Sequence, residues 1–67
     1  MVVFGTRLKE LRTEKHLSQQ QLSQIFSVDR RTISNWENSL REPSLQTVVD
    51  IAKYFEVSAD YLLGLEN

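Results

Sequence analysis

Residues 17–38 read LSQQQLSQIFSVDRRTISNWEN, and two short stretches within them carry apolar residues at helical spacing. Only Ser27, Val28 and Asp29 separate the two stretches. Because so few residues must redirect the chain, the two helices are expected to meet at a steep angle through a tight turn. This spacing predicts a helix-turn-helix over about residues 18–38.

Four predicted helix starts share a local pattern in which an apolar residue precedes a residue that can cap the helix. The side-chain oxygen of each cap is expected to accept a hydrogen bond from a first-turn N–H, which contributes about 1 kcal/mol. Ser18 and Gln21 also complete a capping box. Because the pattern recurs, it disfavours the alternative that the caps are ordinary surface residues. The caps are Ser18, Asp29, Ser44 and Ser58, and the flanking apolar pairs are Leu17 with Leu22, Val28 with Ile33, Pro43 with Val48 and Val57 with Leu62.

Apolar residues recur at helical intervals along the whole chain, and no segment alternates as a strand does. They predict five short helices, the last over about residues 59–63. A chain of 67 residues is too short for two cores, so we expect a single all-α domain over residues 1–67, built as a compact bundle. The residues that recur at helical spacing are Phe4, Leu8, Leu11, Leu22, Ile25, Phe26, Ile33, Trp36, Leu45, Val48, Ala52 and Phe55.

The residue inventory excludes several classes of site. The chain has no cysteine and one histidine, His16, which is expected to be a helix-end residue. It has no glycine-rich phosphate loop, and a core this small leaves little room for a shielded pocket, so an enzyme is the weakest interpretation. We predict no catalytic residue, no metal, no cofactor and no small-molecule ligand. Without a signal peptide or a membrane span, a cytoplasmic location is expected.

The formal net charge of -1 argues, taken alone, against nucleic-acid binding. The charges are, however, unevenly distributed along the chain. Residues 1–41 hold seven Lys/Arg against four Asp/Glu, whereas residues 42–67 hold one Lys against five Asp/Glu. The chain can therefore present one basic face.

The third predicted helix carries a polar face opposite Ile33 and Trp36, which are expected to point into the core. An α-helix fits the major groove of B-DNA, where arginine can bond two acceptors of guanine and asparagine can bond adenine. Arg30, Arg31 and Asn35 have this chemistry and lie in the first two turns, where a recognition helix meets base edges. The alternatives are an ordinary solvated face and, for Trp36, a ring that stacks on a base.

Residues 17–22 and 28–38 resemble the lambda repressor-like (XRE, Cro-type) helix-turn-helix family. Residues 43–45 and 57–64 are similar to the fourth and fifth helices of that family, so the resemblance covers nearly the whole chain. It implies a sequence-specific regulator of transcription, most simply a repressor, that binds double-stranded DNA. Such a protein would act as a homodimer on an inverted repeat, with one recognition helix, about residues 30–38, in each half-site.

The resemblance also implies roles for individual residues. Gln19, at the start of the second helix, would hold a phosphate with help from backbone N–H groups. Asn38 and Arg41, after the third helix, match positions that grip the DNA backbone and set register. The residues that would read bases are Arg30, Arg31, Asn35 and, as a helper, Ser34.

The same resemblance pairs Arg12 with Glu37 in an ion pair that would tie the first helix to the third and aim the recognition helix. Arg12 could also touch a phosphate, and an unremarkable surface role for both residues is the alternative. Relatives usually have glycine where this chain has His16, Ser27 and Ser39. A left-handed backbone there costs a non-glycine residue about 1–2 kcal/mol, so the turn would be looser or slightly reshaped.

A second class of function stays open at this point, a protein-interaction module such as an antitoxin or a regulatory adaptor. Its support is the acidic C-terminal half and the apolar residues Leu62, Leu63 and Leu65. We expect Leu62 to lie in the core and some of the others to contribute to a dimer contact.

Overall fold

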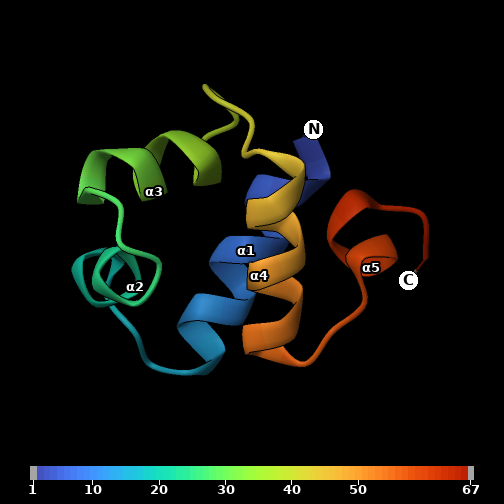
Figure 1. Ribbon diagram of the computed structural model, residues 1–67, viewed down its shortest axis with the longest axis horizontal. Helices are drawn as coiled ribbons and strands as arrows, with labels where there is room; N and C mark the ends of the chain where they lie inside the picture. The colour runs from blue at the N-terminus through green and yellow to red at the C-terminus, as the bar shows by residue number, and fades with distance from the viewer. Residues whose placement is uncertain (1, 67) are drawn as a thin grey trace.

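The computed structural model describes residues 2–66, which form five α-helices (Figure 1). No strand occurs in this part of the chain. The predicted all-α class with five helices is therefore confirmed. The helices are α1 (Val2–Glu14), α2 (Gln19–Ile25), α3 (Arg30–Glu37), α4 (Leu45–Phe55) and α5 (Ala59–Leu63).

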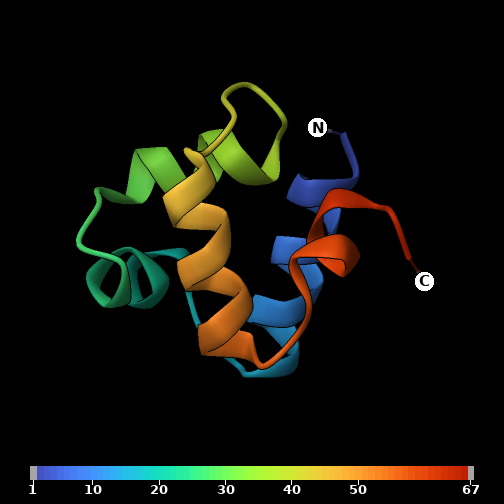
Figure 2. The same cartoon turned by 45° about the vertical axis from the view of Figure 1, so that its right-hand side comes forward.

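The helix-turn-helix forms one end of the molecule. Figures 1 and 2 show α2 and α3 side by side at this end, with α5 at the opposite end. α3 contacts both α2 and α1, and α5 contacts both α1 and α4. α1 therefore connects the two ends of the molecule. It contacts α3 near the C-terminus of that helix, away from the turn that joins α2 to α3.

Three of the four predicted caps are confirmed. The hydroxyl of Ser18 accepts from the backbone N–H of Gln21 at 3.0 Å, and the Gln21 side chain accepts from the Ser18 N–H at 2.8 Å. Ser44 and Ser58 accept in the same way from backbone N–H groups of their first turns. These bonds satisfy groups that a helix N-terminus otherwise leaves unpaired.

The prediction for the fourth cap is partly wrong. Asp29 lies at the N-cap of α3 with an extended backbone, but its side chain accepts no cap hydrogen bond. Its main-chain carbonyl instead accepts from the N–H groups of Thr32 and Ile33, at 3.0 and 3.4 Å. The carboxylate remains exposed at the helix N-terminus, where a negative charge is still favourable.

Most of the residues at helical spacing form the core, and the predicted burial of Ile33, Trp36 and Leu62 is confirmed. Two of the residues at helical spacing lie outside the core, because Ile25 is 39% exposed and Leu45 is 84% exposed. Each residue is the terminal residue of its helix, where helical spacing continues but the packed neighbour does not. Ile51 is fully buried and was missed by the sequence analysis.

The backbone is left-handed at the three positions where the family resemblance implies glycine. The φ angles are 58° at His16, 57° at Ser27 and 61° at Ser39. Glu56, the C-cap of α4, is a fourth such residue with φ 57°, and nothing in its local sequence indicated this. These residues end helices or form turns, where a left-handed residue satisfies the last carbonyl groups.

Candidate nucleic-acid interface

α3 separates its apolar and polar side chains onto two faces. Ile33 and Trp36 are buried against the core, as the sequence predicts. Arg30 and Arg31, in the first turn, are exposed. Among residues 2–66, neither guanidinium has a hydrogen-bond or ion-pair partner, so both are free to bind a ligand in solution.

Ser34 and Asn35 are half-buried, and are less open than the fully exposed face that the sequence predicts. The backbone N–H groups of Leu40 and Arg41 donate to the carbonyl oxygen of Asn35 at 2.9 and 3.4 Å, which folds the following loop back onto α3. Nδ2 of Asn38 donates to Oγ of Ser34 at 3.3 Å. The loop therefore covers part of these two residues from their C-terminal side.

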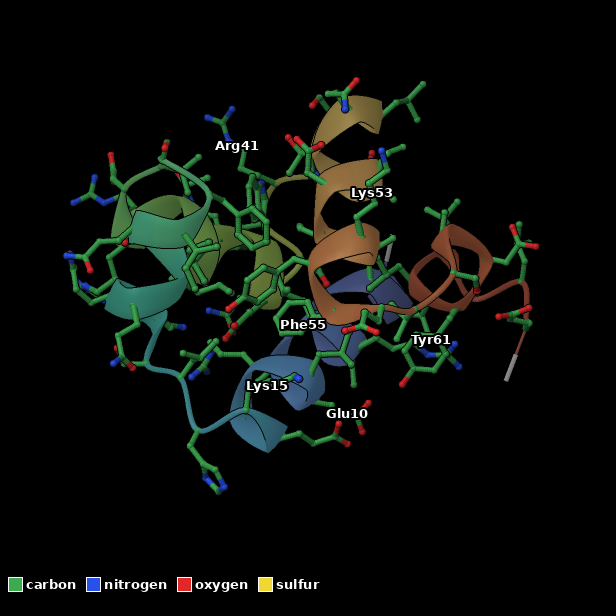
Figure 3. The ribbon with its side chains drawn as sticks, turned by 60° about the horizontal axis from the view of Figure 1, so that its bottom comes forward. Glu10, Lys15, Arg41, Lys53, Phe55 and Tyr61 are labelled. Atoms are coloured by element: carbon green, nitrogen blue, oxygen red, sulfur yellow. The ribbon has the colours of Figure 1, made fainter. Side chains whose placement is uncertain are left out.

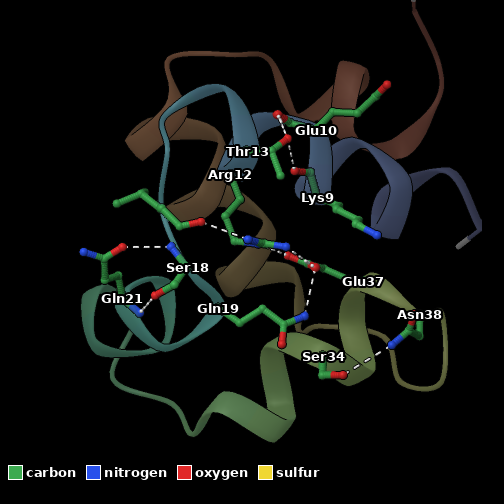
Figure 4. A network of polar contacts seen from close by, with 11 residues as sticks. Lys9, Glu10, Arg12, Thr13, Ser18, Gln19, Gln21, Ser34, Glu37 and Asn38 are labelled. Carbon is green, nitrogen blue, oxygen red and sulfur yellow. Dashed lines mark hydrogen bonds and ion pairs between the residues drawn. The ribbon is translucent and has the colours of Figure 1, made fainter.

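A buried ion pair joins α1 to the end of α3 (Figure 4). Nε of Arg12 donates to Oε2 of Glu37 at 2.6 Å, and Nη2 donates to Oε1 at 3.0 Å. The Arg12 and Glu37 side chains are only 12% and 2% exposed. Nη1 of Arg12 donates to the carbonyl oxygen of Leu17 at 2.8 Å, so Arg12 also contacts the segment that precedes α2. The ion pair is thus buried, in contrast to the surface alternative.

The pKa of the Arg12 guanidinium is raised above its ordinary value. The main cause is the hydrogen bonds that the guanidinium donates to the Glu37 carboxylate, and the coulombic attraction of the same carboxylate adds to them, whereas partial burial acts in the opposite direction. Arg12 is therefore held in its charged form, and its loss would leave a buried carboxylate without a cation.

Gln19 joins this network from the first turn of α2. Its Nε2 donates to Oε1 of Glu37 at 3.1 Å, a contact that the sequence analysis missed. Glu37 therefore accepts from side chains of both α1 and α2 while it lies on α3. The contact fixes the Gln19 side chain and leaves one amide hydrogen and the amide oxygen for another partner.

The predicted site residues lie on four segments, which are α1 with Arg12, the start of α2, α3 itself and the loop after it. Figure 4 shows Gln19, Ser34 and Asn38 along the same side of the polar network. Arg41 is exposed and extends from the loop between α3 and α4 (Figure 3). Side-chain hydrogen bonds join Arg12 and Gln19 to Glu37, and Asn38 to Ser34. Within residues 2–66, none joins the side chain of Arg30, Arg31 or Arg41 to another predicted site residue.

Gly5 is a structural residue that the sequence analysis missed. A Cβ at this position would lie 2.5 Å from the carbonyl oxygen of Trp36 and 2.7 Å from that of Glu37. Only glycine lets α1 approach the end of α3 so closely. An isolated glycine inside a helical pattern often has such a packing reason, which was the available signal.

Within residues 2–66, no group of three or more His, Cys, Asp or Glu side chains gathers into a potential metal site. In the same part of the chain, no helix combines the length and the apolar character needed to cross a membrane.

Residues 8–62 match the model of the Helix-turn-helix family, and the chain belongs to this family. Among curated proteins, the chain is 40% identical over 64 residues to the HTH-type transcriptional activator BcrR of Enterococcus faecalis. The match covers 96% of this chain but only 31% of that relative. The family that the sequence resembles is thereby confirmed.

Two solved structures share the fold over nearly their full lengths. The restriction-modification controller protein C.AhdI from Aeromonas hydrophila gives a TM-score of 0.79 at 36% identity, covering 91% of this chain and 92% of that one. The c2 repressor of phage P22, solved in complex with a synthetic operator, gives a TM-score of 0.82 at 29% identity, with coverages of 92% and 94%. The lambda repressor-like helix-turn-helix fold is therefore established for this chain.

Proposed function

We propose that this chain is the sequence-specific DNA-binding domain of a transcriptional regulator and that α3 reads the major groove. The observation that carries the proposal is the pair Arg30 and Arg31, which are exposed and unpaired in the first turn of α3. The operator complex of the similar P22 repressor supports double-stranded DNA as the ligand.

The base-reading residues in this proposal are Arg30, Arg31 and Asn35, with Ser34 in support. Arginine can bond O6 and N7 of guanine, and asparagine can bond N6 and N7 of adenine. The Asn35 side chain makes no hydrogen bond within residues 2–66, so its amide is available for a base. The two arginines favour half-sites that contain guanine.

Phosphate groups would be held by Gln19, Asn38 and Arg41, which flank α3 on either side. Gln19 is pre-oriented by Glu37, which reduces the entropy lost on binding. Arg12 acts chiefly as a positioning residue, because three of its N–H groups are already used and its side chain is nearly buried. Its remaining N–H groups would add a phosphate contact at most.

The proposal includes a homodimer on an inverted repeat, and repression as the simplest outcome. Half-sites one helical turn apart separate two recognition helices by about 34 Å. The longest dimension of one chain is 28 Å, so two copies on such a site would lie next to each other. The cytoplasmic location expected from the sequence is kept, since a regulator must reach the cell's DNA.

The protein-interaction alternative has lost part of its support. Leu62 is fully buried and Leu63 is packed against the core, which leaves Leu65 as the exposed member of the three leucines. A partner surface built on these leucines would therefore be small.

Selection of binding sites from randomised duplex DNA tests the proposal. We expect enrichment of an inverted repeat and an affinity for it that falls steeply as salt is added, since binding to phosphates releases counterions. Equal affinity for all duplexes, or an affinity that is independent of salt, would refute the proposed function.

A further inference from the structure

Lys9 lies on α1 beside the last turn of α3. One turn before it, Gly5 approaches α3 so closely that a Cβ would lie 2.7 Å from the carbonyl oxygen of Glu37. One turn after it, Nε of Arg12 contacts the Glu37 carboxylate at 2.6 Å. Residues three and four apart share a helix face, so Lys9 lies along the crossing of α1 with α3. The adjacent Leu8 is buried, which places the exposed Lys9 at the outer edge of that crossing.

The ammonium group of Lys9 is unpaired. Within residues 2–66 it forms neither an ion pair nor a hydrogen bond, and the side chain is exposed. Glu37, the acidic residue at the crossing, is already neutralised by Arg12. In Figure 4 the Lys9 side chain runs from α1 toward the end of α3 that carries Glu37 and Asn38.

We propose that Lys9 binds a phosphate of the DNA backbone, so that the nucleic-acid interface continues from α2 and α3 onto α1. This inference rests on the proposed function. The ligand class is the phosphodiester of duplex DNA, for which a lysine on a flexible stem acts as a point charge. A contact of this kind adds affinity and fixes the position of α3 without reading sequence.

The competing structural role for Lys9 is electrostatic. A cation near the C-terminus of α3 would stabilise the helix through its dipole, without any DNA. That role would change the melting temperature of the free protein, whereas a phosphate contact would change the salt dependence of DNA binding. The two measurements therefore separate the two roles.

The test compares Lys9→Ala with Lys53→Ala on one selected duplex over a series of KCl concentrations. Lys53 is the matched control, because it is an exposed lysine on α4 without a partner among the described residues (Figure 3). We expect Lys9→Ala to weaken binding about three- to tenfold on every duplex and to reduce the slope of log K against log salt by about 1. Lys53→Ala should leave the slope unchanged, and Lys9→Arg should restore it.

The inference is overturned if Lys9→Ala keeps the wild-type slope of log K against log salt. It is also overturned if Lys53→Ala reduces the DNA affinity and the slope as much as Lys9→Ala does. It is also overturned if Lys9→Ala changes only the melting temperature. In all three cases wild-type binding to the duplex remains, so the proposed function survives. If the wild-type protein itself shows no salt-dependent binding to any duplex, the proposed function fails and this inference fails with it.

Discussion

The two halves of the chain carry opposite charge and differ in what they expose. Residues 1–41 hold seven of the eight Lys/Arg and include the unpaired arginines of α3. Residues 42–67 hold five of the nine Asp/Glu, and α4 and α5 contribute Val48, Ile51 and Leu62 to the core. Because Phe4, Leu22 and Ile33 of the first half are buried in the same core, the two halves differ at the surface, where the first half presents the free cations of α3.

The largest expected effect lies in the second half. Ile51→Ala removes a fully buried side chain of α4 and should lower the free energy of unfolding by about 3–4 kcal/mol. The matched control is Leu45→Ala on the same helix, which should change it by less than about 0.5 kcal/mol because Leu45 is 84% exposed. Urea denaturation measures both. Similar losses for the two variants would show that the assigned core is wrong.

The buried ion pair should give the next largest effect. Glu37→Ala leaves Arg12 buried without a counter-ion and should cost about 3 kcal/mol of unfolding free energy. Glu14→Ala, at an exposed position of α1, is the control and should be nearly neutral. Thermal and urea unfolding measure the two variants. A Glu37→Ala variant as stable as wild type would contradict the role of this ion pair in holding α3 against α1.

The sequence predicts the parts of the fold that depend on local interactions. The caps at Ser18 and Ser58 follow from residues within one turn, and both are confirmed. Periodicity alone does not reveal where packing stops, since Ile25 and Leu45 continue the helical spacing but lie outside the core. The left-handed backbone of Glu56 had no local signal.

In the candidate site too, features that depend on local sequence could be predicted and features that depend on tertiary contacts could not. The composition of the polar face of α3 is visible in the sequence, and the DNA-contact roles of its residues remain predictions. The contact of Gln19 with Glu37 and the close approach of Gly5 to α3 depend on how three helices cross. Such tertiary contacts join residues far apart in the chain, so a local signal such as the isolated glycine can mark a position but does not identify its partner.

Within the first half, base-reading and phosphate-binding residues should differ in kind. Asn35→Ala should reduce affinity for the selected site by about 1–3 kcal/mol and relax the preference at one base position. Gln19→Ala should weaken binding to all duplexes alike, because phosphates carry no sequence. Site selection with each variant measures this, and a sequence-specific loss for Gln19→Ala together with a uniform loss for Asn35→Ala would reverse the assignment.

The smallest expected effect concerns the end of α4. Glu56 has φ 57°, a conformation that glycine adopts without steric cost. Glu56→Gly should therefore raise the free energy of unfolding by up to about 1 kcal/mol, since the strain removed exceeds the added entropy of the unfolded chain. Glu56→Ala, which removes the same charge but keeps a Cβ at this left-handed position, is the control. A loss of stability in Glu56→Gly would contradict the left-handed backbone at this position.

Nuclear magnetic resonance of the labelled protein, titrated with a selected duplex, tests the division between the two halves most directly. We predict the largest changes in amide chemical shift at residues 30–38 and at the start of α2, with small changes over most of α4 and α5. The largest changes on α4 and α5, with those of α3 unaffected, would contradict the claim that α3 is the DNA-reading surface.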